Sequence, residues 1–264
     1  MTPTLRPIGL IDSGMGGLTV AKELHSLLPH EDIIYLGDSA NCPYGNKPKD
    51  EILALTHNML KFLESKDVKM ALVACNTISA LFEEYCHAYP FPVVSIILPM
   101  AKTIAEMNIN SVGLIATMFT VKMGRYDAEI KRLRQDIEVY SQGSQNLAGY
   151  VDSGQLDSPE LIGEVSSLAA KFNGLELKHI ILGCTHYPIV EHVFKKAAPS
   201  YVYLNPAKSQ AKESMQILCE KDLMNPQETK GKCTVYTTGD ASVCRDMLNI
   251  LECRGFLIEE VSIL

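Results

Sequence analysis

Two cysteines in this sequence have nearly the same surroundings. Cys75 ends the apolar run KMALVAC and precedes the polar pair NT, whereas Cys184 ends HIILGC and precedes the polar pair TH. An amphipathic segment follows each, so each cysteine is predicted to lie between a buried strand and a helix start. A helix start offers free N–H groups and a partial positive charge, which can bind a carboxylate and lower a thiol's pKa. These thiols could act as bases or nucleophiles, although a strand-end cysteine can also be a small buried apolar side chain.

Polar residues near the two cysteines could share that chemistry. His186 follows Cys184 closely enough to act as a general acid or to orient a thiolate, although a lone histidine is more often structural. In DSGMGG (12–17), Asp12 ends the first strand, and Ser13 with the glycines predicts a tight turn whose N–H groups could approach an anion. The spacing is neither GxGxxG nor a P-loop, so a nucleotide site is only weakly indicated, and a plain capped turn is the alternative.

The other cysteines show no pattern typical of a site. CPYG (42–45) predicts a loop in which Tyr44 and Gly45 could hydrogen-bond a ligand, or which is simply a turn. No cysteine pair forms CxxC, and no Cys/His grouping has the close spacing of a structural zinc site, so no metal is predicted. Packing is the role predicted for the six remaining cysteines: Cys42, Cys86, Cys219, Cys233, Cys244 and Cys253.

The elements that must position these residues alternate along the chain. Apolar runs predict strands at 8–12, 32–38, 69–75, 92–97, 111–117, 137–141, 179–184, 201–205 and 233–239. Helical stripes are predicted after Cys75 (Ile78, Leu81, Phe82, Tyr85) and after Cys184 (Ile189, Val190, Val193, Phe194, Ala197), with Pro188 in the first turn. This alternation predicts an α/β fold with mostly parallel sheets flanked by helices. The repeated strand–cysteine–helix unit suggests two domains of similar build that face each other.

Composition excludes several classes of protein. The 264 residues are 47% hydrophobic and 21% charged, with a net charge of -7, which argues against nucleic-acid binding. No apolar run is long enough to span a membrane, so no membrane association is predicted. The N-terminal residues lack a signal-peptide pattern, so we expect a cytoplasmic protein with mostly reduced cysteines.

Four motifs together resemble the signatures of the glutamate racemases, within the wider aspartate/glutamate racemase superfamily. DSGMGGLTV, GDSANCPYG, ACNT and GCTHYP occur in that family's order and spacing, and GLIAT with Thr120 is similar to its IATxxT segment. The resemblance covers residues 8 to about 245. It implies two domains, 1–98 plus 208–264 and 99–207, with the active site between them. It also implies an isomerase that converts L-glutamate to D-glutamate for peptidoglycan without any cofactor, and it allows a homodimer.

The resemblance also assigns roles to individual residues. Cys75 and Cys184 resemble the family's catalytic bases for the D- and L-enantiomers, and Asp12 and His186 resemble the side chains that support them. The following residues resemble those that bind the amino and α-carboxylate groups: Asp12, Ser13, Asn76, Thr77 and Thr185. The distal carboxylate is expected to face Pro43, Tyr44, Gly45 and Thr117 or Thr120, and Asp152 is also expected among the substrate-binding residues.

Asp152 is a departure from the family, because the aligned residue is usually glutamate, and Ile78 replaces the alanine of ACNTA. One methylene in a binding site is typically worth about 1–3 kcal/mol, so racemisation of aspartate or another acidic amino acid is an alternative. Two further alternatives are a thiol hydrolase or transferase, which would need one essential cysteine and a covalent intermediate, and a non-catalytic amino-acid-binding protein.

Overall fold

Two parallel sheets form the framework of the protein, which we describe from a computed structural model covering residues 2–263. The first sheet has the order β10-β9-β2-β1-β3-β4 and the second the order β6-β5-β7-β8, and every pairing between their strands is parallel. The first comprises β1 (Ile8–Asp12), β2 (Ile33–Gly37), β3 (Met70–Val73), β4 (Val93–Ser95), β9 (Cys233–Thr237) and β10 (Leu257–Glu260). The second comprises β5 (Ser111–Thr117), β6 (Glu138–Ser144), β7 (His179–Gly183) and β8 (Val202–Leu204). The predicted α/β class is therefore confirmed.

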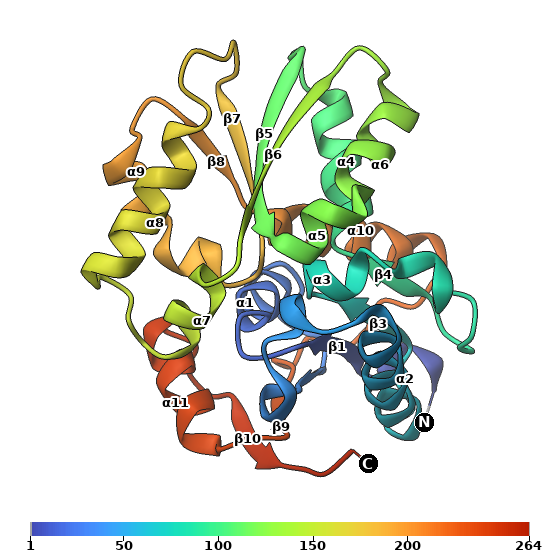
Figure 1. Cartoon of the computed structure of the whole chain (residues 1–264). Helices are drawn as coiled ribbons and strands as arrows, with labels where there is room; N and C mark the ends of the chain where they lie inside the picture. Colours follow the sequence, from blue (N-terminus) through green and yellow to red (C-terminus); the bar gives the residue numbers. More distant parts are fainter. Residues whose placement is uncertain (1, 264) are drawn as a thin grey trace.

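Helices cover both faces of each sheet, and the two sheets lie one above the other in Figure 1. The α-helices are α1 (Leu18–Leu27), α2 (Lys49–Ser65), α3 (Asn76–Ser79), α4 (Ile97–Glu106), α5 (Met118–Met123), α6 (Arg125–Leu133), α7 (Leu147–Asp152), α8 (Pro159–Ala170), α9 (Glu191–Ala197), α10 (Pro206–Glu220) and α11 (Ala241–Ile250). Short 3-10 turns are η1 (Pro3–Leu5), η2 (Ser39–Asn41), η3 (Tyr44–Asn46), η4 (Phe82–Glu84) and η5 (Tyr187–Val190). Among residues 2–263, no helix has both the length and the apolar character needed to cross a bilayer.

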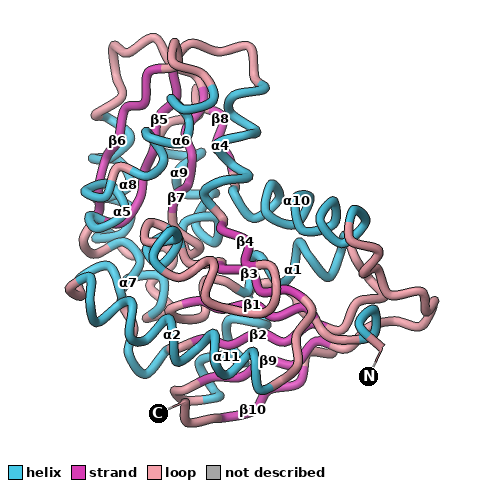
Figure 2. The backbone as a smooth tube through the Cα atoms, turned by 90° about the vertical axis from the view of Figure 1, so that its right-hand side faces the viewer, coloured by secondary structure: helices cyan, strands magenta, loops and turns pink. Residues whose placement is uncertain are grey.

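The hydrophobic core is continuous between the sheets. One cluster joins Leu10 and Leu72 of the first sheet to Leu114 and Ile181 of the second, through buried side chains of α1, α4, α6 and α10. Separate clusters fill the outer faces, under α2 and α3 in the first sheet and under α8 and α9 in the second. The helices α4 and α10 therefore pack at the place where the two sheets meet (Figure 2).

The nine predicted strands are all present, within a few residues of their predicted ends. A tenth strand, β10, was missed because it is a mostly exposed edge strand without a continuous apolar run. The long helix predicted after Cys75 was wrong: α3 has four residues, and the 3-10 turn η4 follows it. After Cys184 the chain first forms η5 and only then α9. The domain boundaries at 98/99 and 207/208 stay a prediction; α4 and α10 run through them, and residues 1 and 264 lie outside the described range.

Candidate active site

The order of the strands explains why the predicted site residues gather. In each sheet the chain first adds a strand on one side of a central strand and then crosses to the other side, at β1/β3 and at β5/β7. The helices that follow such neighbouring strands diverge, leaving a crevice at the carboxyl ends where ligands of α/β proteins bind. Asp12 ends β1 and Cys75 follows β3, whereas Thr117 ends β5 and Cys184 follows β7. The two crevices therefore supply the residues that the sequence indicated.

Direct hydrogen bonds connect the carboxyl ends of the two sheets. Thr185 Oγ1 donates to Asp12 Oδ2 at 3.1 Å, and Thr19 Oγ1 donates to the Thr185 carbonyl oxygen at 3.4 Å. On the other side, Thr77 Oγ1 and Thr117 Oγ1 are 3.1 Å apart. The five residues in these bonds are all at most 9% exposed. The site is thus a closed, polar, largely water-excluded interface between the two crevices.

Cys75 lies in this interface beside Ser13. Its Sγ is 3.3 Å from Ser13 Oγ, and only 5% of the residue is exposed. Burial, followed by the nearby carboxylate of Asp12, raises the pKa of the Cys75 thiol to about 12. The expected lowering by a helix start does not prevail, because α3 is a single turn and the loss of water solvation is larger. Without a ligand, Cys75 is therefore a thiol at neutral pH.

Cys184 has an imidazole and a carboxylate behind it. Its Sγ is 3.5 Å from His186 Nδ1, and His186 Nε2 is 2.7 Å from Asp152 Oδ1. Burial favours neutral His186, but the Asp152 charge and hydrogen bond outweigh it and raise the pKa of His186 well above its usual value. Burial likewise disfavours ionised Asp152, yet His186 and a bond from Cys42 keep the pKa of Asp152 low. The pair is therefore an imidazolium and a carboxylate at neutral pH.

Asp12 is completely buried in the turn that follows β1. Its Oδ1 accepts a hydrogen bond of 3.0 Å from the Gly14 N–H, and its Oδ2 accepts the bond from Thr185. Burial raises the pKa of Asp12 to about 6, and the charge of His186 opposes that rise. Asp12 is thus mostly ionised at neutral pH and is suited to bind a cationic group.

Hydroxyl and amide groups gather between Cys75 and the end of β5. Thr117 Oγ1 lies 2.9 Å from Thr120 Oγ1, which extends the Thr77–Thr117 contact into a row of three hydroxyls. Asn76 Oδ1 accepts a 2.7 Å bond from Tyr126, whereas Asn76 Nδ2 is buried and has no partner among residues 2–263. A buried donor without an acceptor is costly, so Asn76 Nδ2 is a ready donor to a ligand.

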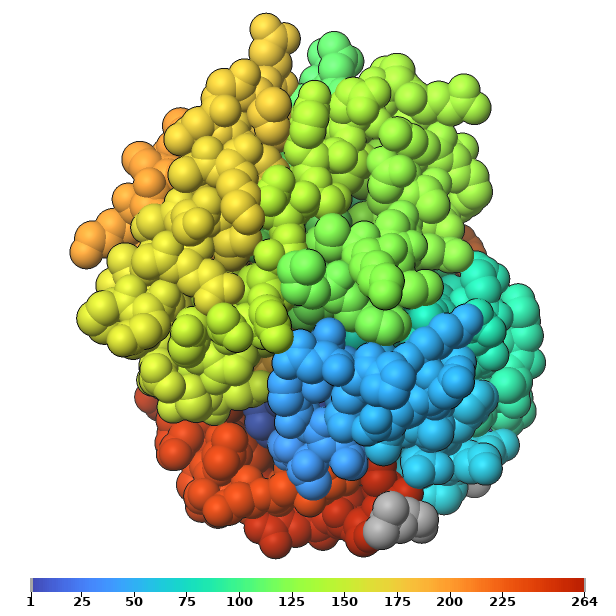
Figure 3. Space-filling model, in the orientation of Figure 1, coloured from blue at the N-terminus to red at the C-terminus, as the bar shows by residue number. Residues whose placement is uncertain are grey.

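The loop Pro43–Gly45 closes over the end of β5. A side chain at Gly45 would place its Cβ 3.2 Å from Thr117 Cβ, so the backbone passes directly beside that residue. Tyr44 donates its hydroxyl hydrogen to Asp38 Oδ2 at 2.5 Å, which leaves its oxygen able only to accept from a ligand. Figure 3 shows the blue surface of this region meeting the green surface of α5 and the yellow-green surface of α7 along a continuous line.

Cys42 was assigned to packing, but the structure places it at the site. Its Sγ donates to Asp152 Oδ2 at 3.2 Å, although 110 residues separate the two in the chain. Tyr126 and Asp38, which hold Asn76 and Tyr44, were also not among the predicted site residues. Only the position of Cys42 directly before the PYG loop could have suggested its role from sequence. Asp152, expected to bind the substrate, contacts Cys42 and His186 in this structure, and its contact with the substrate stays a prediction.

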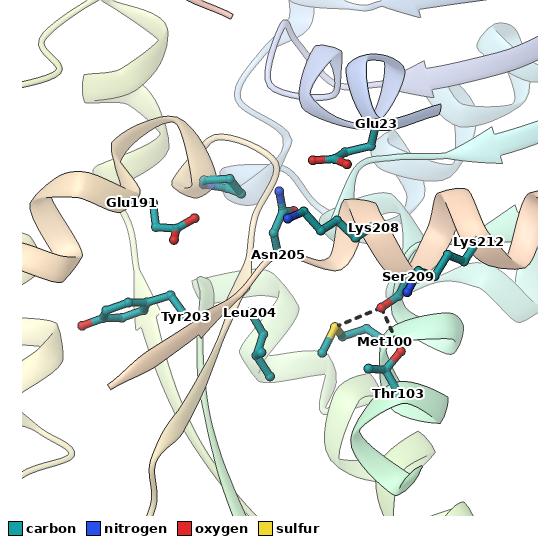
Figure 4. Close-up of a pocket in the computed structure, with 11 residues that line it drawn as sticks. Glu23, Met100, Thr103, Glu191, Tyr203, Leu204, Asn205, Lys208, Ser209 and Lys212 are labelled. Carbon is teal, nitrogen blue, oxygen red and sulfur yellow. Dashed lines mark hydrogen bonds between the residues drawn. The ribbon is translucent and has the colours of Figure 1, made fainter. Parts of the chain in front are cut away.

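Two other features lie outside this constellation. Glu83, Cys86 and His87 hold their ligand atoms within 4.8 Å of one another and could bind a metal ion, but Glu83 is already paired with Arg125. A pocket of about 430 Å³ lies near the start of α10. Figure 4 shows its lining residues, among them Lys208, Glu23 and Ser209, which hydrogen-bonds to Met100 and Thr103. None of the predicted site residues lines this pocket, so it is separate from the two-cysteine site.

The comparisons with known proteins cover nearly the whole chain. Residues 8–213 match the family model described as Asp/Glu/Hydantoin racemase. A glutamate racemase of Shouchella clausii is 36% identical over 239 residues, which are 90% of this chain and 87% of that protein. The crystal structure of glutamate racemase isoform RacE1 from Bacillus anthracis gives a TM-score of 0.91 at 30% identity, covering 97% of both chains. The glutamate racemase from Francisella tularensis in complex with D-glutamate gives 0.90 at 32% identity, covering 98% of both.

Proposed function

This chain belongs to the Asp/Glu/Hydantoin racemase family, and we propose that it is a glutamate racemase, an isomerase that makes D-glutamate for peptidoglycan without a cofactor. The observation that carries the mechanism is the pair of buried thiols, one from each sheet, each with its own polar partner. Ser13 Oγ contacts the Sγ of Cys75, and His186 Nδ1 contacts the Sγ of Cys184. Burial and the charge of Asp12 raise the pKa of Cys75 most, and charge on Cys184 adds a smaller rise, which supports assigning both thiols to one site.

Inversion at Cα needs two acid–base groups on opposite faces of the substrate. One thiolate takes the α-proton, the electron pair of the C–H bond delocalises onto the α-carboxylate, and the opposite thiol delivers its proton to the other face. One base alone would tend to return the proton to the side it came from. Cys184, beside the imidazolium of His186, is the thiol we assign to L-glutamate, and Cys75 is assigned to D-glutamate. Positioned acid–base groups typically contribute about 10²–10⁴-fold to the rate.

The remaining polar groups would bind the two ends of glutamate. We assign the ammonium group to the carboxylate of Asp12, which is buried and forms no ion pair with any side chain of residues 2–263. The α-carboxylate is assigned to Asn76 Nδ2, Thr77 and Thr185, and hydrogen bonds there stabilise the charge that develops during proton removal. The cationic ammonium group would also offset the cost of ionising Cys75, whose pKa is high in the unliganded site.

The test follows solvent deuterium into Cα. Purified protein is incubated in D₂O with L-glutamate, and separately with L-aspartate, while NMR measures Cα deuterium and circular dichroism measures optical activity. We expect deuterium entry and loss of optical activity with glutamate. Cys75→Ala and Cys184→Ala should each lower racemisation by at least about a hundredfold. Cys219→Ala is the matched control, because Cys219 is an exposed cysteine of α10, and it should retain wild-type activity.

Each other outcome selects an alternative. Racemisation of aspartate alone would keep the two-thiol mechanism and change the substrate. One essential cysteine, together with a covalent adduct visible by mass spectrometry, would indicate a thiol hydrolase or transferase. Binding of either amino acid without exchange would indicate a non-catalytic binding protein.

We also propose that the enzyme works in the cytoplasm on free glutamate, without a nucleic-acid partner and as a homodimer. The net charge of -7 supports the exclusion of nucleic acid, because such binding requires clustered cationic side chains. Sedimentation at micromolar concentration tests the dimer, and a monomer mass at all concentrations would contradict it.

A further inference from the structure

Asp152 has an unusual partner for the carboxylate of an acid–base pair. Its Oδ1 contacts His186, and its Oδ2 accepts from the thiol of Cys42 at 3.2 Å. These are the only side chains among residues 2–263 that hydrogen-bond to this carboxylate, so Cys42 and His186 together determine its orientation. A continuous row of contacts therefore runs from Cys42 through Asp152 and His186 to Cys184.

We propose that Cys42 is a positioning residue whose thiol holds the Asp152 carboxylate against His186 and thereby supports proton transfer at Cys184. This inference rests on the proposed racemase function. Cys42 does not touch the reacting atoms in this role; it acts only through Asp152. The proposal assigns a role to the one cysteine of the site that the two-thiol mechanism leaves unused.

The location of Asp152 explains why it needs a second partner. Asp152 is the last residue of the six-residue helix α7, and its side chain is 26% exposed, compared with 3% for His186. A pocket of about 400 Å³, lined by Cys42, Pro43 and Asp152, adjoins it. Without the thiol, one carboxylate oxygen would be free to turn toward solvent in that pocket. Water would then compete with the imidazolium for the charge of Asp152.

The contact also joins the two parts of the molecule. Cys42 lies in the loop after β2 of the first sheet, and Asp152 belongs to α7, which follows β6 of the second sheet. The carboxylate is therefore fully held only when this loop and α7 are together, as they are in Figure 3. In this way the thiol links closure of the site to the state of the His186–Cys184 pair.

Cys42 is a dependable donor because it keeps its proton. Burial, followed by the charge of Asp152, raises the pKa of the Cys42 thiol far above its usual value. The other charged or titratable groups facing Asp152 are His186, whose imidazolium favours the carboxylate, and Asp12, whose charge opposes it. Asp240 lines the adjoining pocket, and Tyr35 is near enough to feel the charge of Asp152. None of these last three residues hydrogen-bonds to Asp152.

Three substitutions separate hydrogen bonding from packing. Cys42→Ser keeps a donor, Cys42→Val fills the space without one, and Cys42→Ala removes both. We measure kcat/KM for glutamate between pH 5.5 and 9. Loss of the donor lets the Asp152 carboxylate turn away from His186, so the pKa of the His186 imidazolium should fall and the basic limb of the profile should move to lower pH in the alanine and valine variants. One lost bond to a charged group predicts a decrease of about 3- to 10-fold at pH 8.5 and less than about twofold at pH 6. Serine should restore the wild-type profile.

A second readout does not depend on the substrate. The rate at which iodoacetamide alkylates Cys184, followed by peptide mass spectrometry across the same pH range, should shift in the same variants. A valine profile that matches wild type would show that Cys42 only fills space and would overturn the proposal. If alanine fails to fold, serine and valine alone decide. A shifted alkylation profile in a protein that racemises neither amino acid would support the positioning role of Cys42 and reject the racemase function. Normal racemisation with unshifted profiles would support the racemase function and reject the positioning role.

Discussion

At the scale of single residues, the site holds ionisable groups in an environment that disfavours their charge. Asp12 is the clearest case, because it is fully buried and its negative charge is offset by hydrogen bonds and by His186 rather than by a contacting cation. Such an arrangement is suitable for binding a cation but costs stability when no ligand is present. The cost depends on pH and can therefore be measured.

Asp12→Asn should stabilise the unliganded protein at neutral and alkaline pH. The folded pKa of Asp12 is about 6, above the value of 3.8 for the free side chain. The contribution of protonated Asp12 to the free energy of unfolding is therefore fully present below pH 3.8 and is lost as pH rises through 6. Asparagine cannot ionise and should be more stable than wild type at pH 8, by on the order of 2 kcal/mol, with a smaller difference at pH 5. Urea unfolding at both pH values measures this.

Asp246→Asn, at an exposed position of α11, is the control. It should leave the change in the free energy of unfolding between pH 5 and pH 8 the same as in wild type. The same Asp12→Asn variant should lose racemase activity, because the proposed partner of the ammonium group is no longer anionic. Equal unfolding free energies of Asp12→Asn and wild type at both pH values would contradict this account of Asp12.

The sequence predicted the members of the site better than their contacts. Residues at the carboxyl ends of strands could be found because parallel sheets bring those ends together, as for Asp12, Thr117 and the two cysteines. The contact of Cys42 with Asp152 could not be found, since it joins segments that are far apart in the chain. The raised pKa of Cys75 depends on burial, which no local pattern around ACNT discloses.

At the scale of elements, apolar runs indicated strands reliably because strands buried on both faces are continuous in hydrophobicity. The stripe after Cys75 misled, although its side chains are buried as predicted, because a short helix followed by 3-10 turns buries the same positions. In the edge strand β10 the signal was absent, since Leu257 and both glutamates of that strand are exposed. Pattern therefore predicts burial more securely than backbone conformation.

Gly37 illustrates how one element positions another. A Cβ at this position of β2 would lie 2.3 Å from Met15 Cε and 2.4 Å from the Gly14 carbonyl oxygen. The methionine can move, but the backbone of the 12–17 turn can only shift as a whole. Gly37→Ala should therefore destabilise the protein by about 1–3 kcal/mol and lower kcat/KM by at least about tenfold, because the turn carries Asp12 and Ser13. Unfolding and steady-state kinetics measure the two effects.

Gly163→Ala is the matched control for that substitution. Nothing lies within 4 Å of a Cβ at Gly163, which is inside α8, so alanine should stabilise the protein by about 0.5–1 kcal/mol and leave kcat/KM unchanged. Full activity of Gly37→Ala at temperatures where it is folded would show that the turn tolerates displacement.

At the scale of the whole molecule, the chain builds the first sheet, then the second, and returns to complete the first. Strands β9 and β10 come after the whole of the second sheet, yet β9 pairs with β2. Figure 1 accordingly shows the red C-terminal elements beside the blue ones. The repeated cysteine unit could suggest two similar parts, but no local signal specifies which strand the returning chain will join or that one core continues between the sheets.

A buried ion pair secures this return. Lys69 Nζ contacts Glu31 Oε2 at 2.5 Å, and their side chains are only 1% and 2% exposed. Lys69 also donates to the carbonyl oxygens of Thr4 and Leu223, and Glu31 accepts from the Asn225 N–H. The pair thereby connects the N-terminal segment, the turn before β2 and the segment that leads from α10 toward β9.

Lys69→Met should be strongly destabilising, because it leaves the charge of Glu31 buried without a partner. A loss of about 3–5 kcal/mol is expected for breaking such a pair. The double variant Lys69→Met/Glu31→Leu should lose less than the single variant, since no charge remains buried, although the three backbone groups lose their partners. Lys102→Met is the control: the Lys102 side chain is 51% exposed and that of its partner Glu213 still reaches solvent at 21%, so a loss of at most about 1 kcal/mol is expected. Urea unfolding measures the free energy of unfolding of each variant. If Lys69→Met lowers it no more than Lys102→Met does, the packing of β9 against β2 alone holds the returning chain in place.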